Sequence, residues 1–168
     1  EAEYARAFKQ LEDALAIIEN APDRQPQDLV TLLTTMAEGR FILGSPVVAS
    51  NLLTRAIHIG EQALPPNHPV LARTRRDVSI MRFMTGDLTG AKRELDRCLV
   101  VQRRHYGPDH IAVAISEQLS ALIALSEGKL TDADETLARC AVTIEKSIGT
   151  ESYQYGVNLH IQALVAMR

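Results

Sequence analysis

The sequence predicts an all-α fold, an α-solenoid of stacked antiparallel helical hairpins. Hydrophobic residues make up 46% of the 168 residues, aromatic residues only 4%, and Trp is absent. This composition favours thin helices packed through small side chains over a β-sandwich. Glycines recur at intervals of 42 residues, with apolar residues spaced by three or four between them. The chain is therefore long enough for about four hairpins, or eight helices.

The 42-residue spacing recurs in several columns of the sequence. It relates Gly44, Gly86 and Gly128. Three further columns agree four times: Ala7, Ala49, Ala91 and Ala133; Leu11, Leu53, Leu95 and Leu137; and Ala14, Ala56, Cys98 and Cys140. A repeat of this length predicts one structural unit per period. We expect a single domain over residues 1–168, with units of about 2–43, 44–85, 86–127 and 128–168.

Each unit contains two amphipathic helices joined by a turn. Leu88, Ala91 and Leu95 lie on one helical face, whereas Lys92 and Asp96 lie outside it. Extended to the whole chain, this pattern predicts helices near 3–20, 27–43, 46–64, 69–85, 88–106, 110–127, 130–148 and 152–168. The recurring Ala column predicts close helix packing, because a larger side chain would force the backbones apart.

The turn Gly107-Pro108-Asp109 separates two of these helices. Gly accepts a positive φ after a helix, Pro cannot continue one, and Asp can cap the next. His68 and His110 occupy equivalent loop positions. We expect these histidines to bond to a helix start rather than to bind a metal, because no Cys, Asp or Glu cluster converges on them.

Charge and composition argue against several classes of partner. The net charge of −3 provides no attraction for nucleic acid, and no apolar run approaches the length of a membrane span. Two cysteines make no disulfide framework, which favours a reducing compartment, the cytoplasm. The sequence begins without Met and ends at Met167-Arg168 inside a helical pattern, so we expect a segment of a longer protein.

Catalytic and cofactor sites are not predicted. Cys98 and Cys140 lie in the small-residue column, where we expect them to fill the core, too far apart for a disulfide and without a neighbouring base. The segment 86–90 lacks the Lys and the strand that a phosphate-binding loop needs. We therefore expect a non-enzymatic segment with no catalytic, metal or cofactor-binding residue.

The succession of Gly86, Ala91, Leu95, Cys98 and the loop 107–110 resembles the tetratricopeptide repeat. The 42-residue length resembles the kinesin-light-chain subtype of that family, and the resemblance covers nearly the whole chain. It implies a right-handed superhelix in which the first helix of each hairpin lines a concave groove that binds a protein or peptide. The groove-lining helices would be 27–43, 69–85, 110–127 and 152–168.

The resemblance also implies specific partner contacts: Thr31, Thr34, Glu38, Arg73, Arg76, Ile80, Ile115, Gln118, Leu122, Val157, His160 and Leu164. The family prefers apolar residues where this chain has Arg75, Glu117, Ser120 and Gln162. In the third and fourth units, apolar residues fall on the face that the family exposes, namely Ile115, Leu119, Leu122, Val157, Ile161 and Leu164. Either those helices are rotated or the groove there is apolar, which would suit an apolar partner.

Two interpretations remain open for Arg73, Arg75 and Arg76, which cluster beside Asp77. They form a solvated face, or Arg73 and Arg76 bind carboxylates of a peptide, for which the guanidinium fork is well shaped. Two functions follow. The first is a protein-binding scaffold within a larger bacterial signalling or regulatory protein. The alternative is a self-association module that forms a homodimer through apolar surface at the ends of the segment or around Ile115 and Val157.

Overall fold

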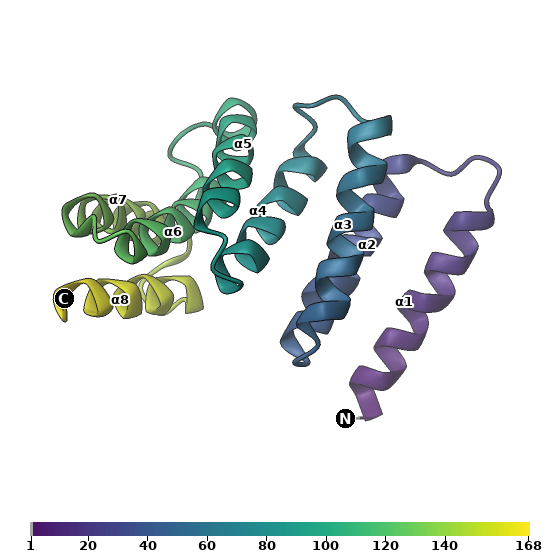
Figure 1. Ribbon diagram of the computed structural model, residues 1–168, viewed down its shortest axis with the longest axis horizontal. Helices are drawn as coiled ribbons and strands as arrows, with labels where there is room; N and C mark the ends of the chain where they lie inside the picture. Colours follow the sequence, from purple (N-terminus) through teal and green to yellow (C-terminus); the bar gives the residue numbers. More distant parts are fainter. Residues whose placement is uncertain (1) are drawn as a thin grey trace. The chain divides into compact units, whose positions relative to one another are not determined.

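The computed structural model describes residues 2–168, with side chains from Arg6 onward, and within that range it is all-α (Figure 1). The helices of this range are α1 (Ala2–Asn20), α2 (Pro26–Ile42), α3 (Pro46–Ala63), α4 (Pro69–Met84), α5 (Leu88–Tyr106), α6 (Ile111–Ser126), α7 (Leu130–Ile148) and α8 (Tyr153–Ala166). Their bounds agree closely with the predicted ranges. The predicted fold class, an all-α solenoid of helical hairpins, is confirmed.

The repeating glycines build the turns from α2 to α3, from α4 to α5 and from α6 to α7. Gly44, Gly86 and Gly128 have φ values of 74°, 83° and 77°, which place them in the left-handed region. The residue after each glycine bonds back across the helix end, as in the 2.9 Å bond from the Asp87 N–H to the Arg82 carbonyl. This is the Schellman pattern, which satisfies the last carbonyls of a helix. The glycine column therefore sets the points at which α2, α4 and α6 end.

The two loop histidines bond to helix starts as expected. Nδ1 of His110 accepts from the Ala112 N–H at 3.1 Å, and Nδ1 of His68 accepts from the Val70 N–H at 3.3 Å. His110 itself is the N-cap of α6. The expectation that Asp109 caps this helix is wrong, because α6 begins at Ile111 and the capping position falls on the histidine.

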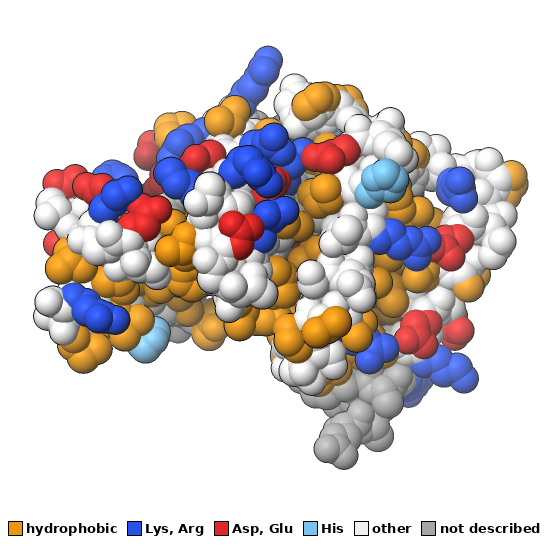
Figure 2. All heavy atoms as spheres, viewed as in Figure 1, with side chains coloured by type: hydrophobic (Ala, Val, Ile, Leu, Met, Phe, Trp, Pro, Cys, Tyr) orange, Lys and Arg blue, Asp and Glu red, His pale blue; other side chains and the backbone are white. Residues whose placement is uncertain are grey.

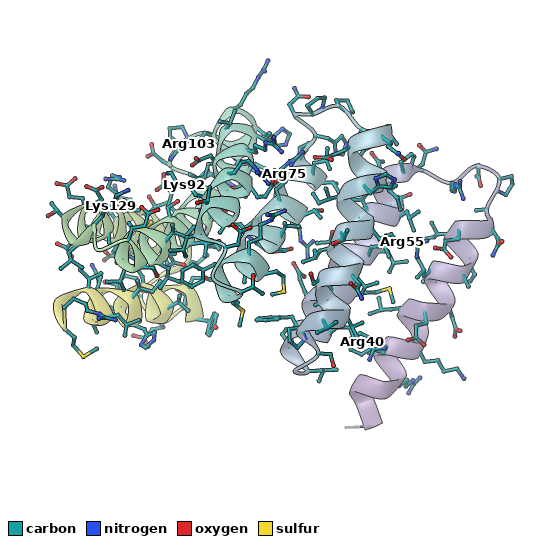
Figure 3. All side chains as sticks on the ribbon, in the orientation of Figure 1. Arg40, Arg55, Arg75, Lys92, Arg103 and Lys129 are labelled. Atoms are coloured by element: carbon teal, nitrogen blue, oxygen red, sulfur yellow. The ribbon has the colours of Figure 1, made fainter. Side chains whose placement is uncertain are left out.

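The helices divide into two compact units, residues 1–81 and 82–168. In the first, α2 packs against α1 and α3 around a core of Leu29, Val30, Leu33 and Ala56. Two arginines reach α1 from its neighbours (Figure 3): Arg40 donates to Glu12 at 3.0 Å, and Arg55 pairs with Glu19. The first core thus lies between α2 and the helices on either side of it.

In the second unit, α6 contacts α5, α7 and α8. Its core contains Ala121, Ala133, Leu137, Ile161 and Val165. The predicted small-residue column has the expected role here and in the first unit, because Ala49, Ala91 and Ala133 are all fully buried. Ala7, at the equivalent position of α1, is exposed. Within residues 2–168, no helix combines the length and hydropathy needed to span a bilayer.

Candidate functional site

A charge cluster of Glu38, Arg73, Arg76 and Asp77 joins α2 to α4 in the first unit. Arg73 grips Glu38 with two bonds, Nε to Oε1 at 3.2 Å and Nη2 to Oε2 at 2.6 Å. Nη2 of Arg76 lies 3.7 Å from Oε1 of the same carboxylate. Hydrogen bonding to Glu38 raises the pKa of Arg73. The side chains of Arg73 and Arg76 remain 45% and 23% exposed, so both guanidinium groups stay within reach of a partner.

Asp77 is the buried member of the charge cluster. Its Oδ1 accepts from Nε and Nη2 of Arg76 at 3.1 and 3.0 Å. Burial raises the pKa of the Asp77 carboxyl to about 6, with the charge of Glu38 acting in the same direction and that of Arg76 opposing both. A carboxylate that loses water must be paired to stay ionised. In Asp77, pairing with Arg76 only partly offsets the rise in pKa that burial causes.

Thr34 and Gln118, two of the expected partner contacts, are buried instead, with 1% and 3% of their surfaces exposed. The Thr34 hydroxyl lies 2.9 Å from that of Thr74. Nε2 of Gln118 donates to Oδ1 of Asn158 at 3.3 Å and to the Gln154 carbonyl at 3.0 Å. Thr34 therefore joins α2 to α4, and Gln118 joins α6 to α8. A partner cannot reach them in this structure, because the neighbouring helix covers them.

The second unit carries an apolar edge, formed by Ile115 and Leu122 on α6 and by Val157 and Leu164 on α8. All four side chains are half-buried. Leu122 and Val157 pack on the same core cluster. Hydrophobic side chains are visible over this part of the molecule in Figure 2. An apolar edge of this kind can receive apolar side chains of a partner.

The apolar side chains of α6 and α8 divide between the core and the surface. Leu119 and Ile161 face the core, with 8% and 2% of their surfaces exposed. Leu159 is 51% exposed on α8, and its neighbour His160 is also exposed. The helices thus turn one apolar row inward and keep a second row at the surface.

The other expected contacts have mixed environments. Thr31 is exposed, and its hydroxyl donates to the Gln27 carbonyl of its own helix at 2.7 Å. Ile80 is half-buried on α4. The exposed or half-buried members of the expected set remain predictions of partner contact.

Two departures from the family pattern are matched by opposite charges. Nη2 of Arg75 on α4 donates to Oε1 of Glu61 on α3 at 2.7 Å. Nη2 of Arg103 on α5 donates to Oε1 of Glu117 on α6 at 2.6 Å. Arg75 and Arg103 are marked in Figure 3. Each of these charged side chains at an apolar family position is paired with an opposite charge on the preceding helix.

The thiols are poor candidates for chemistry. Burial, the largest cause, raises the pKa of Cys140 to about 12, and the nearby Glu117 charge acts in the same direction. The Cys140 thiol donates to the Ala114 carbonyl at 3.4 Å, and Cys98 is fully buried. A nucleophilic cysteine needs a lowered pKa and an exposed sulfur. Among the described residues, no group of three or more His, Cys, Asp or Glu side chains is placed to hold a metal ion.

A small polar pocket of about 180 Å³ lies between α5, α6 and α7. Its charged lining residues pair with one another, Lys92 with Asp96 at 3.7 Å and Lys129 with Glu127 at 2.6 Å. Asp132 adds one further carboxylate. Because the charges at this pocket largely cancel, it selects neither an anion nor a cation.

Comparison with known proteins supports the resemblance seen in the sequence. The family description "tetratricopeptide repeat" matches residues 71–112. A putative kinesin light chain from Podosopora anserina with nearly identical TPR-like repeats superposes with a TM-score of 0.71 at 17% identity, covering 99% of this chain and 79% of that chain. Residues 71–112 thus match a tetratricopeptide repeat, and the chain has the fold of kinesin-light-chain-like repeats. Such repeats generally mediate protein–protein interaction, and their fold is typically a non-catalytic scaffold.

A second structure has the same repeat fold. BtubC (BKLC) from P. vanneervenii superposes with a TM-score of 0.84 at 12% identity, over 98% of this chain. The chain spans 66% of the length of that protein. A search of curated proteins finds no match to the sequence. At these identities the likeness establishes the fold, and the function has to be argued from the side chains.

The role of Asp77 was missed by sequence reasoning, which grouped it with a basic surface run. The signal lay in the 42-residue register, because Asp77 occupies the column of Leu119 and Ile161. An acid in an apolar column of a tetratricopeptide repeat marks a position where a charge is buried. The ion pairs Glu61–Arg75 and Arg103–Glu117 were also missed. Each pair joins two columns of the repeat, and only the fold brings those columns together.

Proposed function

We propose that this chain is a non-catalytic protein-binding scaffold that takes a peptide or protein partner on its groove-lining helices. In the first unit the binding surface is the exposed part of the charge cluster on α2 and α4. In the second unit it is the apolar edge of α6 and α8 together with Leu159 and His160. The observation that carries the proposal is that these helices keep accessible guanidinium and apolar groups beyond those that the core uses.

The chemistry of the two surfaces describes the partner. Arg73 and Arg76 can add hydrogen bonds to a carboxylate, because each guanidinium has five donors and the intramolecular contacts occupy only some of them. The apolar edge suits aliphatic or aromatic side chains. We therefore expect acidic peptides at the first unit and apolar peptides at the second, without nucleic acid or membrane as partner.

We place this segment in a larger bacterial signalling or regulatory protein of the cytoplasm. Buried thiols at Cys98 and Cys140 are compatible with a reducing compartment. A binding module of this kind acts by bringing its partner to the other parts of such a protein.

The test is selection of peptides from a random display library, followed by affinity measurement with variants. Arg73→Glu combined with Arg76→Glu should weaken acidic peptides by about tenfold or more, since it replaces two attractions by two repulsions. The matched control is Arg104→Glu with Lys146→Glu, which makes the same charge change at exposed sites on α5 and α7. Equal affinity in both variants would exclude the charge cluster as the binding surface.

The apolar edge has an equally matched pair of variants. Leu159 on α8 and Val142 on α7 are 51% and 50% exposed, so an Asp at either position disturbs the core little. Leu159→Asp should weaken apolar peptides, whereas Val142→Asp should not. If Val142→Asp weakened binding and Leu159→Asp did not, the binding surface would lie on the helices that do not line the groove.

Self-association is the second candidate, favoured by the 81% exposure of Tyr153 and the 51% exposure of Leu159 on α8. Light scattering coupled to size exclusion over a concentration series measures it directly. A dimer that Leu159→Asp abolishes and Val142→Asp preserves would assign α8 to a homodimer interface. A monomer at every concentration would exclude this candidate.

A further inference from the structure

Asp77 is an ionisable group at a core position of the repeat. Its equivalents 42 and 84 residues later are Leu119 and Ile161, which are 8% and 2% exposed. Asp77 itself is 6% exposed. An apolar side chain satisfies such a position without hydrogen bonds, whereas a carboxylate there requires several.

The carboxylate of Asp77 is only half satisfied. Both of its strong bonds, from Nε and Nη2 of Arg76, go to Oδ1. Oδ2 is buried and makes no hydrogen bond within the described part of the chain. A buried carboxylate oxygen in this state gains from accepting a proton, because the resulting hydroxyl can donate to an acceptor.

Glu38 on α2 supplies a second carboxylate to the charge cluster. Among the described residues, the charged groups that act on Asp77 are Glu38 on α2 and Arg73 and Arg76 on its own helix. Nη2 of Arg76 lies 3.0 Å from Oδ1 of Asp77 and 3.7 Å from Oε1 of Glu38, so the two carboxylates flank one guanidinium nitrogen, and the charge of Glu38 raises the pKa of Asp77. Two ionised carboxylates cannot bond to each other, but a carboxyl and a carboxylate can share one proton.

We propose that Asp77 and Glu38 share one proton, held on Oδ2 of Asp77, and that its uptake strengthens binding of acidic peptides at Arg73 and Arg76. With both carboxylates ionised, the two acids balance the two arginines. With the proton bound, the cluster carries a net positive charge, and Arg76 loses the closer of its two ionic partners. The second half of the proposal rests on the proposed function, and the first half does not.

The proton itself is tested without any partner. Carboxyl-carbon NMR of aspartate-labelled chain should show one side chain titrating with a midpoint near pH 6. The signal should vanish in Asp77→Asn and persist in the exposed control Asp13→Asn. Glu38→Gln should move the midpoint to lower pH, because it removes the neighbouring charge. A midpoint below about pH 5, or one unchanged by Glu38→Gln, would overturn the shared proton.

The coupling to binding is tested by calorimetry with a poly-glutamate peptide whose ends are blocked. Its carboxylates stay ionised above about pH 5.5, so the peptide charge is constant in the range used. Near pH 7.5, Asp77→Asn should bind the peptide about threefold more tightly than the unmodified chain, as expected for one charge at a partly exposed site. Near pH 5.5 the two affinities should converge, because both clusters then carry the same charge.

The outcomes separate the two halves of the proposal. Equal affinities of Asp77→Asn and the unmodified chain at both pH values would overturn the coupling and leave the shared proton standing. Binding that survives Arg73→Glu with Arg76→Glu would refute the proposed binding surface, whatever the NMR midpoint. A midpoint near pH 6 together with converging affinities would support both halves.

Discussion

Arg75 and Glu61 form the same contact as Glu117 and Arg103, with the charges exchanged. The members of each pair are 14 residues apart, and the two pairs are related by one 42-residue repeat. In both, the more buried side chain lies on the even-numbered helix, α4 or α6: Arg75 is 9% exposed against 47% for Glu61, and Glu117 is 16% exposed against 49% for Arg103. If α3 packed on α6 instead, Glu61 would face Glu117 and the two carboxylates would repel each other. The exchanged charges therefore favour the native pairing of α3 with α4 and of α5 with α6.

Charge exchange tests this pairing in the second hairpin. Arg103→Glu should lower the free energy of unfolding by about 1 kcal/mol, because the half-exposed pair is screened by solvent and the variant adds repulsion. Adding Glu117→Arg should recover most of that loss in urea unfolding followed by circular dichroism. Lys92→Ala, which removes an exposed pair with Asp96, serves as the control and should change stability by less than about 0.5 kcal/mol. A double variant with a lower free energy of unfolding than either single variant would contradict the pairing.

The Ala column gives a second prediction. Ala91 is fully buried, so Ala91→Leu should overpack the second unit and destabilise it by about 1–3 kcal/mol. Ala138, exposed on α7, is the matched site for the same substitution and should tolerate it. Denaturant midpoints of the two variants give the answer. If Ala91→Leu were as stable as the unmodified chain, close helix approach at this column would be refuted.

The hydroxyl pair of Thr34 and Thr74 gives a third. Each hydroxyl also lies close to a carbonyl of its own helix, Val30 at 2.8 Å and Val70 at 3.0 Å. Thr34→Val alone should cost about 1 kcal/mol, because it leaves a buried hydroxyl with fewer bonds, whereas Thr34→Val with Thr74→Val should be nearly neutral. A double-mutant cycle in urea measures the coupling. Additive losses would mean that the two hydroxyls do not interact.

The buried Asp77 predicts a pH dependence of stability. Its pKa is about 6 in the folded chain, above the ordinary value of 3.8, so the folded state retains a proton that the unfolded state releases. The resulting stabilisation is complete below the unfolded pKa and is lost as the pH rises through the folded one. Relative to Asp77→Asn, the unmodified chain should lose about 3 kcal/mol between about pH 4 and pH 7. Unfolding at a series of pH values measures it, and a constant difference between the two chains would refute it.

The thiols give the fifth prediction. With its pKa raised to about 12, buried Cys140 should resist alkylation at moderately alkaline pH. Cys98 should resist as well, because it is fully buried. Mass spectrometry after a short pulse of iodoacetamide should find both modified in urea and neither in buffer. Rapid labelling of the folded chain at either position would show that the surrounding helices open.

Much of the fold could be predicted from residue order alone. The helix ends follow from glycines that accept a positive φ and from prolines that start α2, α3 and α4. The inward rows follow from spacing by three and four. These are local properties, because backbone conformation and the face of a single helix depend on neighbours within a few residues.

The candidate site was less predictable. Spacing placed Thr34, Gln118 and His160 on related faces of their helices, yet only His160 is exposed. From the sequence, Asp77 was expected to belong to a basic surface run, yet it is buried beside Glu38, 39 residues away. Whether a face is covered depends on the next groove-lining helix, about one repeat further along the chain.

The sequence by itself determined the repeat, the class of fold, the ends of the helices and the small side chains at their closest approach. The tertiary structure decided which polar residues became buried links, which charges found opposite partners, and where one buried carboxyl keeps an oxygen without a hydrogen-bond partner. The physical reason is that helix formation and amphipathicity are short-range, whereas burial and charge pairing arise only when helices distant in sequence pack together.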